Sequence, residues 1–145
     1  MKTYFDTGVF LKLYTPEPES EAVQRFVLRR RSPIRITSLH LSEATSALKL
    51  KCFRGEGSER ESNAAIADIE ADLHARVLVR LTCDWEEVWN LGRFLSEHHA
   101  ARIGTGTLDV LHVACARLLG YREFMTTDSR QKACAKAAGL KAISP

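Results

Sequence analysis

The sequence predicts an α/β fold of three layers, α/β/α, in which helices cover both faces of a central parallel sheet of about five strands. Short apolar runs alternate along the chain with longer stretches in which apolar residues recur every three or four positions. The alternation continues from end to end without a repeat or a linker-like segment. We therefore expect residues 1–145 to form one domain.

The expected strands and helices follow from the spacing of apolar residues. Strands are predicted where short apolar runs lie between turn signals, at residues 2–6, 34–37, 77–82, 123–127 and 141–143. Helices are predicted where the spacing changes to three and four, at residues 7–14, 18–31, 38–53, 58–75, 84–99, 107–119 and 129–138. The boundary signals are Pro16 and Pro18 before the second helix, the capping boxes Ser58-x-x-Glu61 and Asp84-x-x-Glu87, and Gly120 and Gly139 at helix ends.

The helix at 84–99 has apolar residues around more than one narrow stripe, among them Trp85 and Trp89. We predict that both tryptophans pack in the core. The alternative is that they form a surface which a second copy or a partner covers.

The composition is that of an ordinary folded domain, with 45% hydrophobic and 27% charged residues. No apolar run approaches the roughly 20 residues that cross a bilayer, and we expect a cytoplasmic protein. Four cysteines lie far apart with no Cys-x-x-Cys pair, which predicts free thiols rather than a zinc or redox site. The net charge of +3 permits a polyanionic partner without requiring one.

Carboxylates in apolar surroundings are the most informative feature. Most of the 18 acidic residues lie in hydrophilic stretches and need only water, as is expected for Glu17 and Glu19. Four others have apolar neighbours: Asp6, Glu43, Asp109 and Asp128. An ionised carboxylate beside apolar surface is costly unless it is paired or bound to a metal.

The expected fold brings these four carboxylates towards one edge of the sheet. Asp6 and Asp128 are predicted at the carboxyl ends of strands, where ligands bind in an open parallel sheet. Glu43 and Asp109 are predicted in the first turns of helices that follow a strand and a loop. Four gathered acids repel one another unless a divalent cation offsets their charge, and oxygen ligands suit Mg²⁺ or Mn²⁺. The sequence thus predicts a metal site able to activate water for phosphoryl transfer.

Each carboxylate also has a structural explanation. Asp128 is a plausible helix cap in the box Asp128-x-x-Gln131, and Asp6 is a plausible cap of the helix that follows it. Asp109 and Glu43 are also explained as ordinary acids near helix N-termini, where the helix dipole favours negative charge. The coincidence of all four acids favours the metal site over four separate structural roles.

Four segments, in this order, resemble the PIN domain family. They are a first strand ending in an aspartate with a turn and helix (Tyr4–Tyr14), a glutamate before a small residue (Ser38–Ala44), an Asp-x-x-His-x-Ala helix (Thr107–Ala114), and a closing strand and aspartate (Phe124–Asp128) followed by Ala135–Leu140. Each segment is short, but together they span nearly the whole chain. In size and detail the chain resembles the VapC-like toxins of toxin–antitoxin pairs.

This resemblance implies roles for particular residues. Asp6, Glu43 and Asp109 match the catalytic, metal-binding acids, and Asp128 matches a fourth, more variable one. A fifth acid that some members carry is absent. The remaining matched positions are two hydroxyls that orient a carboxylate or water, Thr7 and Thr126.

The resemblance further implies an Mg²⁺- or Mn²⁺-dependent endoribonuclease. Such proteins are commonly homodimers, held inactive by a cognate antitoxin protein, and often cut structured RNA such as transfer or ribosomal RNA. A metal-activated water would attack the scissile phosphate and leave a 5′-phosphate and a 3′-hydroxyl. Two alternatives stay open: a nuclease of the same fold acting in RNA maturation or on DNA flaps, and a non-catalytic RNA-binding module.

Residues close to the acids in sequence also bear on the site. His112, three residues after Asp109, is interpreted as a supporting residue of the site, with a general base as the alternative. Arg102, Arg130 and Lys132 flank the acids, and either contact RNA phosphates or lie on a solvated surface.

Overall fold

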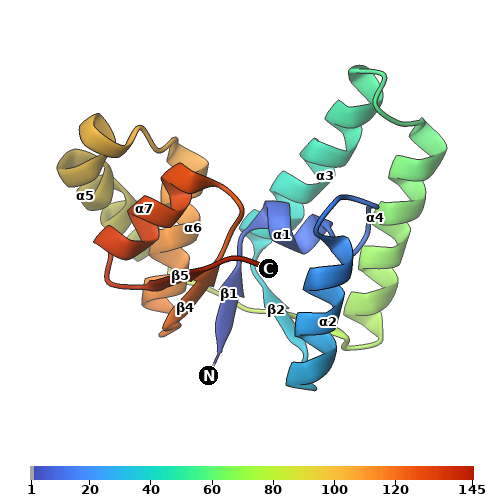
Figure 1. Ribbon diagram of the computed structural model, residues 1–145, viewed down its shortest axis with the longest axis horizontal. Helices are drawn as coiled ribbons and strands as arrows, with labels where there is room; N and C mark the ends of the chain where they lie inside the picture. Colours follow the sequence, from blue (N-terminus) through green and yellow to red (C-terminus); the bar gives the residue numbers. More distant parts are fainter. Residues whose placement is uncertain (1) are drawn as a thin grey trace. The chain divides into compact units, whose positions relative to one another are not determined.

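All five expected strands are present in the computed structural model, which describes residues 2–145, and every pairing between them is parallel. Met1, where the expected domain begins, lies outside the described residues. The hydrogen-bonded ladders lie in two sheets, β1–β4–β5 and β2–β3 (Figure 1). They belong to two compact units, one made of Met1–Val9 with Cys83–Pro145 and the other of Phe10–Thr82.

The first unit holds the three-stranded sheet, in which β4 (Glu123–Met125) lies between β1 (Thr3–Phe5) and β5 (Lys141–Ile143). The pairing of β1 with β4 joins segments about 120 positions apart, with Tyr4 opposite Phe124. Their rings stack with centroids 5.4 Å apart. All of β4 is buried, as expected for a strand with neighbours on both sides.

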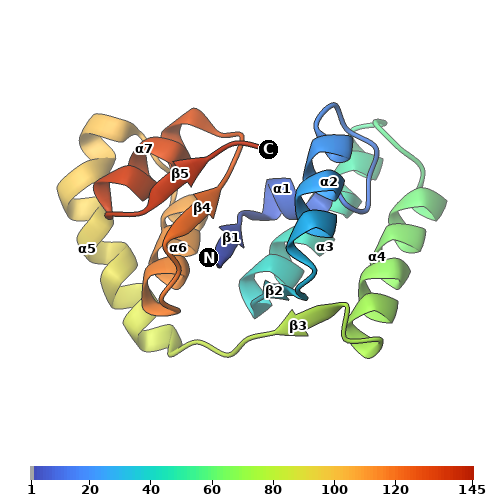
Figure 2. The ribbon, with the colours of Figure 1, turned by 60° about the horizontal axis from the view of Figure 1, so that its bottom comes forward.

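Three helices complete this unit: α5 (Trp85–Ile103), α6 (Thr107–Leu118) and α7 (Ser129–Ala137). Helix α7 packs against β4 and β5, while α5 packs along α6 (Figure 2). Residues 110–116 of α6 are buried without interruption. A helix that is apolar on all sides belongs in the interior, and α6 therefore forms the core of this unit.

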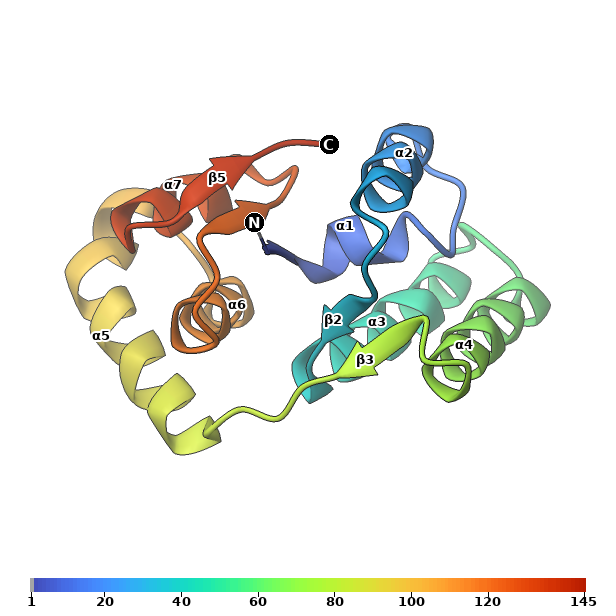
Figure 3. The ribbon, with the colours of Figure 1, turned by 90° about the horizontal axis from the view of Figure 1, so that it is seen from below.

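The second unit is built from a helical hairpin and two strands. Helix α1 (Thr7–Leu11) begins in the first unit and ends in the second. The other elements are α2 (Ser20–Arg30), β2 (Ile34–Ile36), α3 (Ser38–Phe53), α4 (Glu59–His74) and β3 (Leu78–Arg80). Helix α3 packs on α4 and β2, and α4 packs on β3 (Figure 3).

The expected boundary signals are largely confirmed. Ser58 and Glu61 form both halves of a capping box at the start of α4. At the start of α5 one half of the expected box is present: the Asp84 side chain accepts from the Glu87 N–H at 3.2 Å. The expected helix at 7–14 ends early, at Leu11. Gly120 and Gly139 have φ of 74° and 80°, the left-handed conformation that ends a helix at low cost for glycine.

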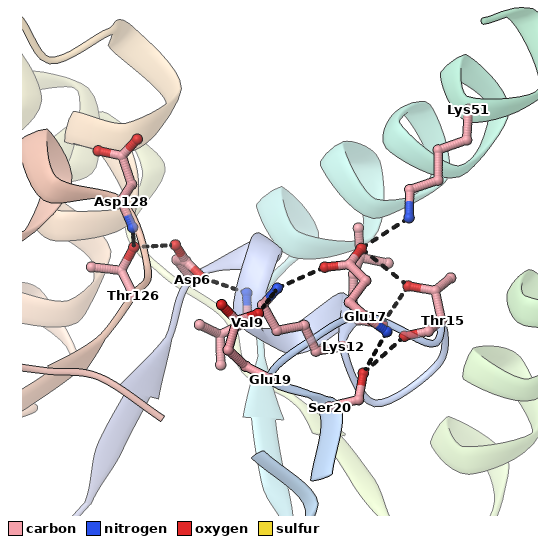
Figure 4. Close-up of polar contacts among 11 residues, drawn as sticks. Asp6, Val9, Lys12, Thr15, Glu17, Glu19, Ser20, Lys51, Thr126 and Asp128 are labelled. Carbon is pink, nitrogen blue, oxygen red and sulfur yellow. Dashed lines mark hydrogen bonds and ion pairs between the residues drawn. The ribbon is translucent and has the colours of Figure 1, made fainter. Parts of the chain in front are cut away.

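The loop after α1 corrects the prediction that Glu17 and Glu19 need only water. The Lys12 ammonium, on a residue only 7% exposed, lies 2.7 Å from Glu17 and 2.9 Å from Glu19 (Figure 4). Lys51 of α3 also reaches Glu17, at 2.9 Å. Burial raises the pKa of Glu17, but the hydrogen bonds from Lys12 and Lys51 outweigh it, and the pKa lies below its usual value. The loop folds back over Lys12, and these acids neutralise a buried cation.

The prediction that both tryptophans of α5 lie in the core is wrong for Trp89, which is 55% exposed. The buried stripe of α5 is Val88, Gly92 and Leu95. At Gly92 the two helices approach so closely that an added Cβ would lie 2.9 Å from Leu111 Cδ2 of α6. Trp89 follows Val88 and is therefore turned about 100° away from that contact.

Two smaller expectations concern the cysteines and the membrane. The four cysteines are free thiols, as predicted. Within residues 2–145, no helix has the length and apolarity that crossing a bilayer requires.

Candidate metal centre

Asp6 is the most buried of the four candidate acids, with 7% of its surface exposed. It follows β1 directly, and its backbone N–H donates to the carbonyl of Met125 at 3.1 Å, extending the ladder by one bond. Its Oδ1 accepts a hydrogen bond from the Val9 N–H at 2.6 Å, at the start of α1. The expected cap is therefore present, and it fixes the direction of the carboxylate.

Thr126 joins Asp6 to Asp128. It follows β4 and is fully buried, and its hydroxyl donates to Asp6 Oδ2 at 2.5 Å (Figure 4). The same oxygen accepts the Asp128 N–H at 3.0 Å. The hydroxyl lies between the ends of two paired strands because the β1–β4 ladder places Phe5 opposite Met125.

Asp128 is exposed and caps α7, its Oδ1 accepting from the Gln131 N–H at 2.8 Å. The cap uses one carboxylate oxygen and leaves the other outside it. The return bond of a capping box is replaced, because the Gln131 side chain lies instead between Thr126 and the Asp109 carbonyl. Capping and metal binding are therefore compatible roles for this side chain.

Asp109 is half-buried in the first turn of α6. Its backbone carbonyl faces Gln131 Nε2 at 3.4 Å. Its carboxylate lies near enough to Asp6 to act on that group electrostatically. The first unit thus brings Asp6, Asp109 and Asp128 to one end of the three-stranded sheet.

Burial raises the pKa of Asp6 above its usual value, and the negative charge of Asp109 adds to this rise. Hydrogen bonds from Thr126 and Val9 and the charge of His112 act in the opposite direction but do not cancel it. The ionised form of Asp6 is therefore the costly one. A cation bound beside Asp6 would lower that cost.

His112 is buried in α6, with a hydroxyl against each ring nitrogen. Nδ1 lies 2.9 Å from Tyr4 Oη, and Nε2 lies 2.9 Å from Thr7 Oγ1. It thereby connects α6 to the hydroxyl next to Asp6. Neither ring nitrogen points to open solvent, and the Thr7 hydroxyl faces this histidine. The supporting roles of His112 and Thr7 at a metal site stay predictions.

Glu43 belongs to the second unit, where it is half-buried in the second turn of α3. The start of that helix is fixed by Thr37, whose N–H and hydroxyl both lie 3.0 Å from His40 Nδ1. This capping box was not predicted from the sequence, because a histidine takes the place of the usual glutamate. The participation of Glu43 in the metal site stays a prediction.

Of the basic residues beside the acids, Arg102 and Arg130 are exposed and Lys132 is half-buried. Arg130 comes within 3.9 Å of the position where Gly104 would carry a Cβ, so its side chain lies over the loop before α6. Arg102 contacts His99, and Lys132 reaches Ser144 at 2.6 Å. RNA contact by these three stays a prediction.

The donor set suits a hard divalent cation. Among the residues that the structure describes, no group of three His, Cys, Asp or Glu side chains forms a ready-made cage. Mg²⁺ does not require one, because it typically binds through one or two carboxylates and completes its octahedron with water and substrate phosphate oxygens. Asp6 fits that mode of binding, because its carboxylate is held in one direction and is costly to ionise without a cation. Asp109 and Asp128 lie nearby.

Replacing Asp6 should stabilise the metal-free protein. Folding raises the pKa of Asp6, so the folded state loses stability relative to the unfolded state as pH rises through the unfolded and then the folded pKa of this group. Asp6→Asn removes the charge, and its amide can still accept from Val9 and donate to Thr126. We expect a higher unfolding midpoint in chelator at pH 7, with the gain shrinking as pH falls towards 4. A midpoint at pH 7 below that of the wild type, or an equal gain in Asp84→Asn, an exposed helix cap, would contradict this.

The two roles of Asp128 can be separated by substitution. Asp128→Ala removes the helix cap and should lower the free energy of unfolding by about 1 kcal/mol. Asp128→Ser keeps a capping oxygen and should stay within about 0.5 kcal/mol of the wild type. Urea unfolding measures both, and equal losses in the two variants would argue against the cap.

Comparison with known proteins identifies the family of this chain. A family model described as PIN domain matches residues 3–137. The chain is 31% identical over 144 residues to Ribonuclease VapC46 of Mycobacterium tuberculosis, covering 98% of this chain and 96% of that protein.

Among solved structures, the crystal structure of FitAcB from Neisseria gonorrhoeae is similar, with a TM-score of 0.64 and 15% identity over 98% of this chain and 96% of that one. The likeness confirms the three-layer, PIN-like α/β fold predicted from the sequence. Because the family match and the VapC relative both extend along nearly the whole chain, this protein belongs to the PIN domain family and is VapC-like within it.

Proposed function

We propose that this protein is a metal-dependent endoribonuclease, the toxin of a toxin–antitoxin pair, which hydrolyses RNA phosphodiester bonds with a metal-activated water. The observation that carries the proposal is the buried carboxylate of Asp6, joined through Thr126 to Asp128 and close to Asp109, in a PIN domain. The relative named as a ribonuclease supports the choice of RNA.

The metal site is proposed to consist of Asp6, Asp109 and Asp128, with Glu43 contributed by α3. The proposal treats residues 1–145 as a single PIN domain, and the family match supports this because it covers elements of both units. Mg²⁺ or Mn²⁺ is the expected ion, since all four donors are carboxylate oxygens.

The bound ion would polarise the scissile phosphate and lower the pKa of a water molecule. The protein supplies orientation. The bonds from Val9 and Thr126 leave Asp6 little freedom to rotate, so its remaining lone pairs keep a constant direction. Of the acids, Asp128 is exposed, so its free oxygen can hold the attacking water or accept its proton.

The expected products are a 5′-phosphate and a 3′-hydroxyl, because water and not the ribose 2′-hydroxyl is the nucleophile. Arg102, Arg130 and Lys132 are proposed to bind RNA phosphates near the acids. Transfer or ribosomal RNA is the proposed substrate class. A cognate antitoxin, a homodimer and a cytoplasmic location complete the proposal.

The direct test is cleavage of transfer and ribosomal RNA fragments by the purified chain with Mg²⁺, Mn²⁺ or chelator. Asp6→Asn and Glu43→Gln should each lose about 3 kcal/mol of transition-state stabilisation, which is about a hundredfold in rate. Glu59→Gln, at an exposed acid outside the site, should cut normally. Product ends are assigned by sensitivity to phosphatase and ligase.

Each contrary result has a separate meaning. Cutting that continues in chelator would rule out the metal mechanism, and full activity of Glu43→Gln would remove that residue from the site. A folded wild type that leaves broad RNA pools intact but cuts a DNA flap would replace RNA as the substrate. Inactivity on both would favour an RNA-binding module.

The partner proposals are tested by light scattering and by co-expression with any small reading frame that lies next to this gene. We expect twice the mass of the chain in dilute solution. Addition of the co-purified partner should suppress RNA cleavage at a stoichiometric ratio. A monomer that remains fully active with the partner present would exclude both proposals.

A further inference from the structure

Gln131 is a buried polar residue that no motif assigns to the site. It lies in the first turn of α7 with 1% of its surface exposed. Its Oε1 is 2.8 Å from the Thr126 hydroxyl, and its Nε2 is 3.4 Å from the Asp109 carbonyl. One side chain thus contacts both the hydroxyl that holds Asp6 and the backbone of a second candidate metal ligand.

We propose that Gln131 is a positioning residue for the metal site, acting through Thr126 on the carboxylate of Asp6. This inference rests on the proposed function. Residues of this kind, which orient ligands without touching the metal, typically change metal affinity or activity by 10–100-fold when they are replaced.

The number of protons on Thr126 supports the proposal. A threonine hydroxyl has one proton and two lone pairs. Thr126 faces two acceptor oxygens, Asp6 Oδ2 at 2.5 Å and Gln131 Oε1 at 2.8 Å, and can donate to only one of them at a time. An ionised carboxylate is the stronger acceptor, so the charged form of Asp6 takes the proton.

Gln131 can resolve the remaining conflict by turning its amide. With Nε2 towards Thr126, the hydroxyl accepts from both Gln131 and the Asp128 N–H while it donates to Asp6, and all its hydrogen-bonding capacity is used. The turn gives up the bond to the Asp109 carbonyl, which at 3.4 Å is long and therefore weak. It leaves Gln131 Oε1 facing that carbonyl oxygen across the same gap, where two acceptors gain nothing from each other. That carbonyl also lies within α6, where the N–H four residues later is its regular partner.

The resulting chain of donors runs from Gln131 to Thr126 to Asp6. It keeps Oδ2 of Asp6 in one direction when the carboxylate is charged, which is the form that binds a cation. Buried polar groups in such a chain strengthen one another and tolerate the loss of a member poorly.

The test measures Mn²⁺ binding by titration calorimetry, with no RNA present. Gln131→Met keeps the length of the side chain and removes its amide. We expect Mn²⁺ to bind about 10–100-fold more weakly. Lys136→Met, an exposed residue of the same helix, should bind Mn²⁺ as the wild type does.

A double-mutant cycle separates positioning from a merely structural role. If Gln131 acts through Thr126, then Thr126→Val with Gln131→Met should bind Mn²⁺ no more weakly than Thr126→Val alone. Additive losses would overturn the proposal. So would unchanged Mn²⁺ affinity in a folded Gln131→Met protein, even if its unfolding midpoint fell.

A measurement on the wild type covers the case in which Gln131→Met does not fold. In an NMR titration with Mg²⁺, the side-chain amide signals of Gln131 should move with the same midpoint as the backbone amide of Asp6. Signals that stay fixed while Asp6 moves would overturn the proposal, as would a wild type that binds neither ion.

The inference and the proposed function fail separately. Wild-type protein that binds Mn²⁺ and loses affinity on Gln131→Met, but cuts no nucleic acid, supports the positioning role and contradicts the nuclease. Metal-dependent RNA cleavage together with full Mn²⁺ affinity of Gln131→Met would overturn only the positioning role.

Discussion

The parallel pairing of β1 with β4 is the constraint on which the candidate site depends. It joins segments about 120 positions apart in the chain, and Thr3 adds a side-chain hydrogen bond to Glu123 at 2.8 Å. Both strands end at the same level, so Asp6 and Thr126 face each other at the carboxyl edge of the sheet. In another register the Asp6 carboxylate and the Thr126 hydroxyl would not lie opposite each other. The site is therefore a direct consequence of strand pairing in the first unit.

Burial of the ionised Asp6 carboxylate costs free energy of folding, and the hydrogen bonds of the fold offset this cost only in part. Burial raises the pKa of Asp6, and the bonds from Thr126 and Val9 restore some of what desolvation removes. Functional sites commonly retain such unfavourable groups, since stability there is exchanged for activity. Asp6 and Asp128 each give one oxygen to a helix N-terminus; the other oxygen of Asp6 accepts from Thr126, and that of Asp128 lies outside the cap. The structural and functional explanations of these acids are thus compatible.

Most of the fold could be predicted because local physical chemistry determines it. The period of the apolar residues placed every strand and helix, and the boundaries of α3 and β5 were predicted to the residue. Caps and glycines located the helix ends, as at Ser58 and Gly139. The candidate acids were recognisable for a related reason: an ionised carboxylate between apolar residues is unfavourable unless it is paired or bound to a metal.

The sequence by itself determined the element types, their order and the carboxylates at strand and helix ends, because these depend on neighbours a few positions away. Which side chains contact one another was decided only by the tertiary structure. Lys12 became a buried cation because a loop folds over it, and Trp89 lies exposed because the contact of α5 with α6 is made one residue away, at Val88. Gln131 shows the same limit at the site. Its sequence context predicts a capping partner for Asp128. Its contact with Thr126 spans five positions, whereas its contact with Asp109 exists only after α6 and α7 have packed together.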